Sequence, residues 1–130
     1  NVFLNSHLNK KILYIINMKQ EITFEEYNKV EIKVGTVISV KKNEKARKPS
    51  LVIEVDFGGA MGVKKSSAQI TDHYNPQSLV GMQVAAVINF PKKQIGPFMS
   101  ECLVTGFTQP DGSIILAVPH KGALNGSRLA

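Results

Sequence analysis

The sequence predicts an all-β domain, a small closed barrel of short strands with short flanking helices and a few extra strands. Three observations lead to this prediction. Short stretches alternate apolar and polar side chains, which is typical of strands with one buried face. Turns rich in glycine and proline separate these stretches. The chain has 130 residues, enough for one domain with its own core, and its single cysteine, Cys102, excludes an internal disulfide.

The first seventeen residues differ in character from the rest and precede Met18, the first methionine. Apolar residues recur there at helical spacing, at Leu4, Leu8, Ile12 and Ile15. Their longest apolar run, "ILYII", is too short for a signal peptide or a membrane span, so we expect no membrane insertion. We interpret residues 1–17 as a non-native or upstream extension, with an added docking helix as the alternative, and residues 18–130 as the domain.

The domain begins with a short predicted helix. In "TFEE", Thr23 can cap the first turn while Glu26 reaches back, so the motif predicts a capping box and a helix that ends near Asn28. The stretch "VEIKVGTVISV" follows and predicts a strand that bends at Gly35. Its alternation places one set of residues on a single face: Val30, Ile32, Val34, Thr36, Ile38 and Val40.

The next stretches continue the same pattern. "LVIEVDF" predicts a second strand with Leu51, Ile53, Val55 and Phe57 inward, closed by the turn "GGAMG", and "VKKSSAQI" predicts a third. "TDHYNPQSLVG" predicts a short helix, with Thr71 or Asn75 as its cap and a proline suited to the first helical position. "MQVAAVINF" then predicts a fourth strand with an inward set that comprises Val84, Ala86, Ile88 and Phe90.

The stretch "NFPKKQIGPFMSE" interrupts the alternation. Its two prolines and its glycine predict a stiff loop that holds Lys92 and Lys93 away from the sheet. "FMSECLVTGF", the turn "QPDG" and "SIILAVP" follow as two further strands joined by a hairpin-type connection. Five or six short strands with a helix between the third and fourth predict the oligonucleotide/oligosaccharide-binding (OB) barrel topology.

The charge distribution favours a polyanionic partner. The chain carries 16 Lys and Arg against 10 Asp and Glu, a net charge of +6. Much of the excess lies in "KKNEKARK", between the first two strands, where an OB barrel has one of its binding loops. We expect RNA contacts from six basic residues: Arg47, Lys48, Lys64, Lys65, Lys92 and Lys93. The alternative is a solvated basic surface that keeps the protein soluble.

Few aromatic rings are placed to stack on bases. The chain has no Trp, and Phe98 and Tyr74 are the only plausible stacking rings, since Phe57, Phe90 and Phe107 fall where core residues are expected. Recognition of a folded RNA by its shape and phosphates therefore fits better than base stacking.

The sequence gives no support for an enzyme, a cofactor or a metal site. The histidines are far apart, and none lies at metal-ligand spacing from another His or from Cys102. Phosphate-binding and dinucleotide-binding glycine motifs are missing, and no Ser/His/Asp arrangement stands out. We interpret Cys102 as a packing residue rather than a nucleophile, and the cysteine usage favours a reducing cytoplasm.

Several blocks together carry a family resemblance: "VEIKVGTVISV", "KARKPSLVIEVDFG", "GVKKSSAQI", "VAAVINFPKKQIGPFMSECLVTG" and "NGSRL". From about Tyr27 onward the chain resembles the tRNA-binding domain family, in particular its CsaA branch of export-related chaperones. The resemblance implies a non-enzymatic OB-fold homodimer that binds tRNA by shape. For the CsaA branch it implies binding of unfolded or precursor proteins and of the SecA export motor.

The resemblance also implies site residues. Lys93 matches a basic position of the family's loop motif, Ser100 and Glu101 match the "SE" that follows it, and Ser66 lies in the matching "SSAQI". A polypeptide-binding chaperone remains the alternative to an RNA-binding protein. For it we expect an apolar rim formed by Met61, Ile95, Phe98 and Met99, because methionine adapts to varied partners.

Overall fold

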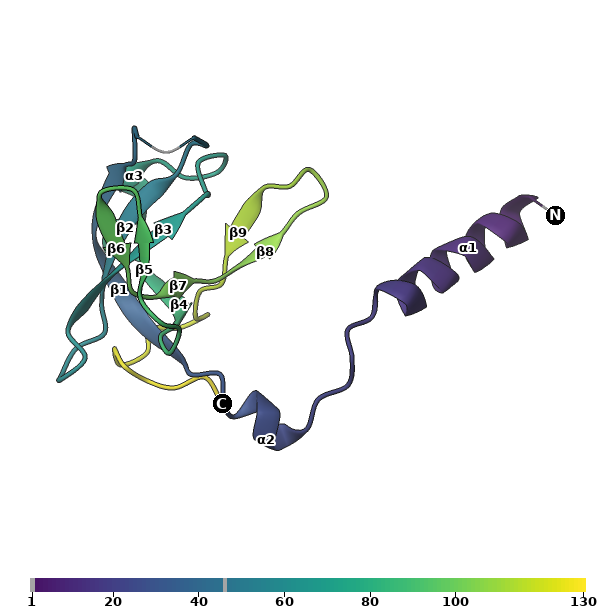
Figure 1. Cartoon of the computed structure of the whole chain (residues 1–130), viewed down its shortest axis with the longest axis horizontal. Helices are drawn as coiled ribbons and strands as arrows, with labels where there is room; N and C mark the ends of the chain where they lie inside the picture. Colours follow the sequence, from purple (N-terminus) through teal and green to yellow (C-terminus); the bar gives the residue numbers. More distant parts are fainter. Residues whose placement is uncertain (1, 46) are drawn as a thin grey trace.

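A five-stranded antiparallel sheet forms the body of the protein in the computed structural model, which describes residues 2–45 and 47–130 (Figure 1). Its strands are β1 (Ile32–Lys42), β2 (Leu51–Asp56), β3 (Val63–Ala68), β4 (Gln83–Val87) and β7 (Leu103–Val104). They lie in the order β3-β2-β1-β4-β7. The sheet curls into a nearly closed barrel, which confirms the predicted all-β OB-like fold.

Hydrogen bonds from β7 and from the two residues before it to β3 close the barrel. The Lys65 carbonyl on β3 accepts bonds from the backbone N–H of Glu101 at 2.8 Å and of Cys102 at 3.3 Å. One residue further along β3, the Ser66 hydroxyl accepts a bond from the Val104 N–H on β7 at 3.2 Å. A barrel without free edges avoids unpaired backbone groups, so this seam is part of what stabilises the fold.

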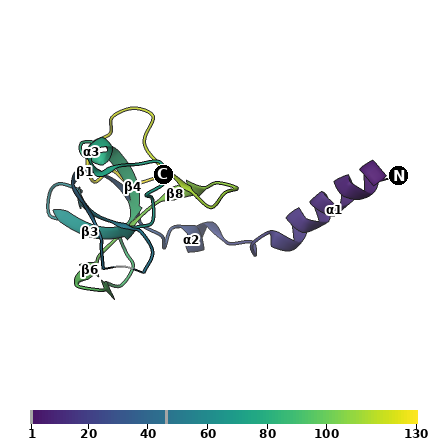
Figure 2. The same ribbon diagram turned by 90° about the horizontal axis from the view of Figure 1, so that it is seen from above.

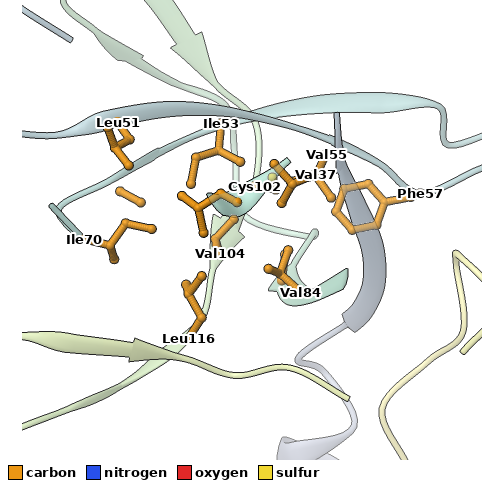
Figure 3. Close-up of a cluster of buried hydrophobic side chains, with 13 residues drawn as sticks. Val37, Leu51, Ile53, Val55, Phe57, Ile70, Val84, Cys102, Val104 and Leu116 are labelled. Atoms are coloured by element: carbon orange, nitrogen blue, oxygen red, sulfur yellow. The ribbon is translucent and has the colours of Figure 1, made fainter. Parts of the chain in front are cut away.

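The core fills the inside of the barrel (Figure 3). On β2 the predicted alternation is confirmed, since every second residue is buried: Leu51, Ile53, Val55 and, just after the strand, Phe57. Val84 of β4, Val104 of β7 and Leu116 join this cluster from the other strands. Burial of these side chains provides the main driving force for folding.

The first strand departs from the predicted alternation in its second half. The pairing of β1 with β2 shifts between Val37 and Ser39, which marks a β-bulge. Val37 is therefore 1% exposed and Ile38 is 44% exposed, so the prediction that Ile38 faces the core is wrong. Gly35 is buried, and a Cβ atom at this position would lie 2.5 Å from a methyl carbon of Val55.

Two aromatic residues predicted for the core lie on the surface. Phe90 is 55% exposed because β4 ends at Val87, where Asn89 turns the chain by bonding to backbone groups of Lys29 and Glu31. Phe107 is 65% exposed on β8, which leaves the body of the barrel (Figure 1). Alternation alone could not show where these strands stop.

The described residues form three helices: α1 (Val2–Asn17), α2 (Phe24–Tyr27) and α3 (Pro76–Leu79). The capping box before α2 is confirmed, with the Thr23 hydroxyl accepting from the Glu26 N–H at 3.0 Å. Asn75, and not Thr71, caps α3. Helix α1 extends away from the barrel in both views (Figure 1 and Figure 2), and the side chain of Leu4 lies outside the described part. No helix among the described residues is long and apolar enough to cross a membrane.

Two hairpins are added to the barrel, and the β8–β9 hairpin projects from it (Figure 1). The predicted stiff loop is instead a hairpin of β5 (Lys93–Ile95) and β6 (Phe98–Ser100), with Gly96 at φ +57° in its turn. A positive φ is readily adopted by glycine, which explains the sharp reversal. The second hairpin, of β8 (Gly106–Thr108) and β9 (Ile114–Leu116), is the predicted one.

Candidate functional site

The β5–β6 hairpin lies against β3 and gathers most of the predicted RNA-binding residues. We call this group the hairpin site, and it comprises Lys64, Lys65, Lys92, Lys93, Ser100 and Glu101. Lys93 and Ser100 are directly paired across the hairpin. Its lysines are exposed except Lys64, which is half-buried, so four cations lie along β3 and at the start of the hairpin beside it.

Glu101 holds the hairpin site together. One of its carboxylate oxygens accepts a bond from the Lys65 N–H at 3.3 Å, and the other lies 3.8 Å from the Lys92 ammonium. The Lys92 side chain is 66% exposed, so the ion pair is weak and leaves the ammonium accessible. Because a carboxylate repels phosphate, the geometry gives Glu101 a positioning role rather than a contact with RNA.

A small cleft of about 260 Å³ adjoins the hairpin site. Its lining combines Lys93 and Ser100 with the apolar side chains of Phe90 and Leu103, both of which are exposed. The cleft therefore presents a charged side and an apolar side next to each other. The sequence analysis missed Phe90 and Leu103, although Pro91 directly after Phe90 signals the end of a strand.

Cys102 also lines this cleft but has the properties of a packing residue. It is 5% exposed, and burial together with the nearby Glu101 carboxylate raises the pKa of its thiol to about 11. The thiol is therefore protonated at neutral pH, and its sulfur lies 3.7 Å from the Lys65 carbonyl. A protonated, buried thiol is a poor nucleophile.

The β1–β2 loop carries the second group of cations. A backbone bond from Asn43 N–H to the Ser50 carbonyl at 3.0 Å extends the β1–β2 ladder into this loop. Five basic side chains on the end of β1 and on this loop are exposed, and we call them together the loop cations: Lys41, Lys42, Lys45, Arg47 and Lys48. In both views the loop lies on the same side of the barrel as the β5–β6 hairpin (Figure 1 and Figure 2). The two segments that carry the basic groups therefore lie on one side of the barrel.

Two predicted site assignments need correction. Ser66 is fully buried, and its hydroxyl serves the barrel seam, so it cannot contact RNA in this conformation. The apolar rim is also not formed as predicted. Ile95 and Phe98 pair beside the hairpin turn and Met99 is exposed next to them, whereas Met61 lies between β2 and β3 and packs against the core.

Comparisons with known proteins agree on one family. Residues 32–128 match the family described as "Putative tRNA binding domain". The chain is 33% identical over 110 residues to the methionine–tRNA ligase of Porphyromonas gingivalis and 31% identical over 111 residues to that of Chlorobium chlorochromatii. Each match covers 85% of this chain but only 16% and 15% of the ligases, so the chain spans about one-sixth of their length.

Solved structures give full-length matches. The chaperone CsaA of Bacillus anthracis is 39% identical with a TM-score of 0.80, and CsaA of Picrophilus torridus is 39% identical with a TM-score of 0.79. In both cases the match covers 85% of this chain and 100% of the other. A protein from Pyrococcus horikoshii related to methionyl-tRNA synthetase shares the fold at 23% identity and a TM-score of 0.76.

Proposed function

The chain belongs to the tRNA-binding domain family, and from this premise we propose that it binds folded tRNA through the hairpin site and the β1–β2 loop, without catalysing a reaction. The observation that carries the proposal is that the β1–β2 loop and the β5–β6 hairpin, which carry exposed cations, lie on one side of the barrel (Figure 1). Cations on one side can meet several phosphates of one RNA at the same time.

The state of these cations supports the proposal. Within the described residues, the ion pairs are Lys33 with Glu31 and Lys92 with Glu101. In that part of the chain, Lys65, Lys93 and the loop cations therefore have no acidic partner. A phosphate can bind them without first displacing a carboxylate. Phe90, exposed beside Lys93 in the cleft, adds one ring on which a base can stack.

The salt dependence of tRNA affinity tests the proposal. If the protein neutralises on the order of four to six phosphates, the plot of log affinity against log salt has a slope of roughly −3 to −5. The variant Lys92→Ala/Lys93→Ala flattens this slope by about one to two units, because each lysine would be a phosphate contact. Lys29→Ala/Lys121→Ala, at two exposed lysines outside the site, is the matched control. A slope near zero for tRNA would overturn the proposal.

A second candidate function is binding of unfolded or precursor polypeptides, as an export-related chaperone that also contacts SecA. The cleft beside the hairpin favours it, because Phe90 and Leu103 are exposed there and Met99 is exposed on β6 nearby. Suppression of aggregation by an unfolded test protein measures this activity. Phe90→Ser should reduce the suppression of aggregation and leave the salt slope for tRNA unchanged. Lys92→Ala/Lys93→Ala should flatten that slope and leave the suppression of aggregation unchanged.

We also propose that the protein is a cytoplasmic homodimer. The outer side chains of the β8–β9 hairpin support the dimer, since Phe107 and Ile115 are paired across the two strands and both are exposed. A dimer would present two copies of the hairpin site to one extended RNA. The family membership supports a cytoplasmic location, and so does the free thiol of Cys102, because the cytoplasm is reducing.

A further inference from the structure

A second and larger pocket lies between the β1–β2 loop and the segment 71–77, which contains the start of α3. Its volume is about 770 Å³, within the range of about 300–1,000 Å³ that is typical of small-molecule sites. We call it the α3 pocket. Two residues singled out from the sequence line it, Arg47 as an RNA contact and Tyr74 as a stacking ring. It shares no lining residue with the cleft beside the hairpin site, so the two are separate.

One wall of the α3 pocket is fixed by hydrogen bonds. The Tyr74 hydroxyl accepts a bond from the Leu116 N–H at 3.0 Å, which ties the segment before α3 to β9. Asn75 caps α3 by accepting from the Ser78 N–H at 2.9 Å. A preformed wall reduces the ordering cost of binding a ligand.

The pocket contains polar side chains that are free to bond a ligand. Within residues 2–45 and 47–130, the side chains of Asn43, Thr71 and Gln77 make no hydrogen bond, yet all three line the pocket. Ser50 lines it as well, is 5% exposed, and carries a buried hydroxyl oxygen without a partner in this described part. A buried hydroxyl normally has a partner, so this oxygen can bond a ligand that enters the pocket.

The charge and shape of the pocket narrow the ligand class. Lys41, Lys42 and Arg47 line it against a single acid, Glu44, and the three cations have no ion pair in the described chain. Apolar surface from Val40, Leu51 and Pro76 lies beside the amide side chains. The cations can bind a phosphate, the amide side chains can hydrogen-bond the edge of a heterocyclic base, and the apolar surface can pack against the face of that base. A nucleotide combines these parts.

We propose that the α3 pocket binds one nucleotide with its base unstacked. The phosphate lies against Lys42 and Arg47, and the base lies against the segment 71–77, where Thr71 and Gln77 bond its edge. The nucleotide can be free or part of a single strand, and the same chemistry serves both. In the second case the proposal rests on the proposed RNA-binding function and adds to it a site for an unpaired nucleotide.

The probes are AMP, CMP, a 5′-phosphorylated tetraribonucleotide and a blunt RNA duplex, with binding followed by the amide NMR signals of the whole chain. We expect the tetranucleotide or the mononucleotides to shift the signals of Thr71 and Gln77, with dissociation constants below the millimolar range. The duplex has no unpaired nucleotide, so it should shift the signals of the hairpin site and leave those two unchanged. Equal affinity for AMP and for the tetranucleotide identifies a free nucleotide as the ligand, and preference for the tetranucleotide identifies a strand.

Variants separate the pocket from general charge effects. Thr71→Ala/Gln77→Ala should weaken binding of the ligand that shifts these signals at least five-fold while leaving duplex affinity within two-fold. Lys42→Gln/Arg47→Gln should weaken binding of the same ligand more than Lys29→Gln/Lys121→Gln does. The second variant removes the same charge from residues outside the pocket. Thermal unfolding of each variant shows that it is folded.

The outcomes are distinct for the two proposals. If tRNA binds with a steep salt dependence but no probe shifts Thr71 or Gln77 at millimolar concentration, the pocket proposal is overturned and the proposed function stands. If the tetranucleotide binds in the pocket and tRNA does not bind, the pocket proposal stands and the tRNA function fails.

Discussion

The hydroxyl oxygen of Ser66 accepts a hydrogen bond from the backbone N–H of Val104 at 3.2 Å and so bridges the two edge strands of the five-stranded sheet. Ser66 is fully buried. Ser66→Ala should therefore leave the buried Val104 N–H without a partner, at a cost of about 1–3 kcal/mol in the free energy of unfolding. Chemical denaturation measures this loss.

Ser67 provides the matched control for the seam. It follows Ser66 on β3, and its side chain is partly exposed and makes no hydrogen bond within the described residues. Ser67→Ala should change the free energy of unfolding by no more than about 0.5 kcal/mol. If the two variants were equally stable, the Ser66 hydroxyl would not be a significant part of the barrel seam.

Tyr74→Phe should loosen the β8–β9 hairpin. The Tyr74 hydroxyl is the acceptor for the Leu116 N–H, and Leu116 is buried, so removing the hydroxyl should cost about 1 kcal/mol. Hydrogen exchange at Leu116 should accelerate as well. Tyr27→Phe removes a hydroxyl that bonds to the exposed Ala130 carbonyl, so as a control it should have little effect on either measurement.

The stability of the protein should fall in alkaline solution because of Cys102. Burial raises the pKa of this thiol from its ordinary value of 9.0 to about 11, so the folded protein binds the thiol proton more tightly than the unfolded chain does. The protonated thiol therefore contributes at most about 2–3 kcal/mol to the free energy of unfolding. This contribution is fully present below about pH 9 and is lost as the pH rises toward 11. Denaturation curves between pH 8 and 11, compared with those of Cys102→Ala, isolate this effect from that of lysine titration. Parallel pH dependences for the two proteins would contradict the prediction.

The parts of the fold that could be predicted are those determined by local pattern. The alternation in β2 gave the correct buried face from Leu51 to Phe57, and the capping box at Thr23 located α2. The bulge at Ile38 could not be predicted, because it depends on how β1 pairs with β2 and not on the residues of β1 alone.

In the candidate site, too, local features could be predicted and contacts between distant segments could not. The basic loop and the lysines next to Pro91 could be recognised from charge and turn residues, and the loop and the β5–β6 hairpin lie on one side of the barrel. The use of Ser66 in the seam and the exposure of Phe90 depend on contacts between segments far apart in the chain. The α3 pocket was missed for the same reason, since its walls come from the β1–β2 loop and from segment 71–77.

Removal of residues 1–17 should leave folding and RNA binding intact. Helix α1 extends away from the barrel (Figure 1), and the capping box and every strand lie beyond the cut. We expect the melting temperature of the truncated protein to stay within about 5 °C, since about 1 kcal/mol would shift it by roughly that amount in a domain of this size. A larger decrease would mean that the segment docks on the domain, as in the alternative interpretation of the sequence.

The mass of the protein in solution should be that of two chains, and the β8–β9 hairpin should be the reason. Phe107 is 65% exposed and Ile115 is 37% exposed, so this pair leaves an apolar surface open to water on a projecting hairpin. Phe107→Lys places a charge on that surface and should yield single chains in light scattering at micromolar concentration. Phe24→Lys, at a residue 77% exposed on α2, is the control and should leave the mass unchanged. If the unmodified protein had the mass of one chain, the homodimer would be excluded. If instead Phe107→Lys remained dimeric, the dimer would have to form through another surface.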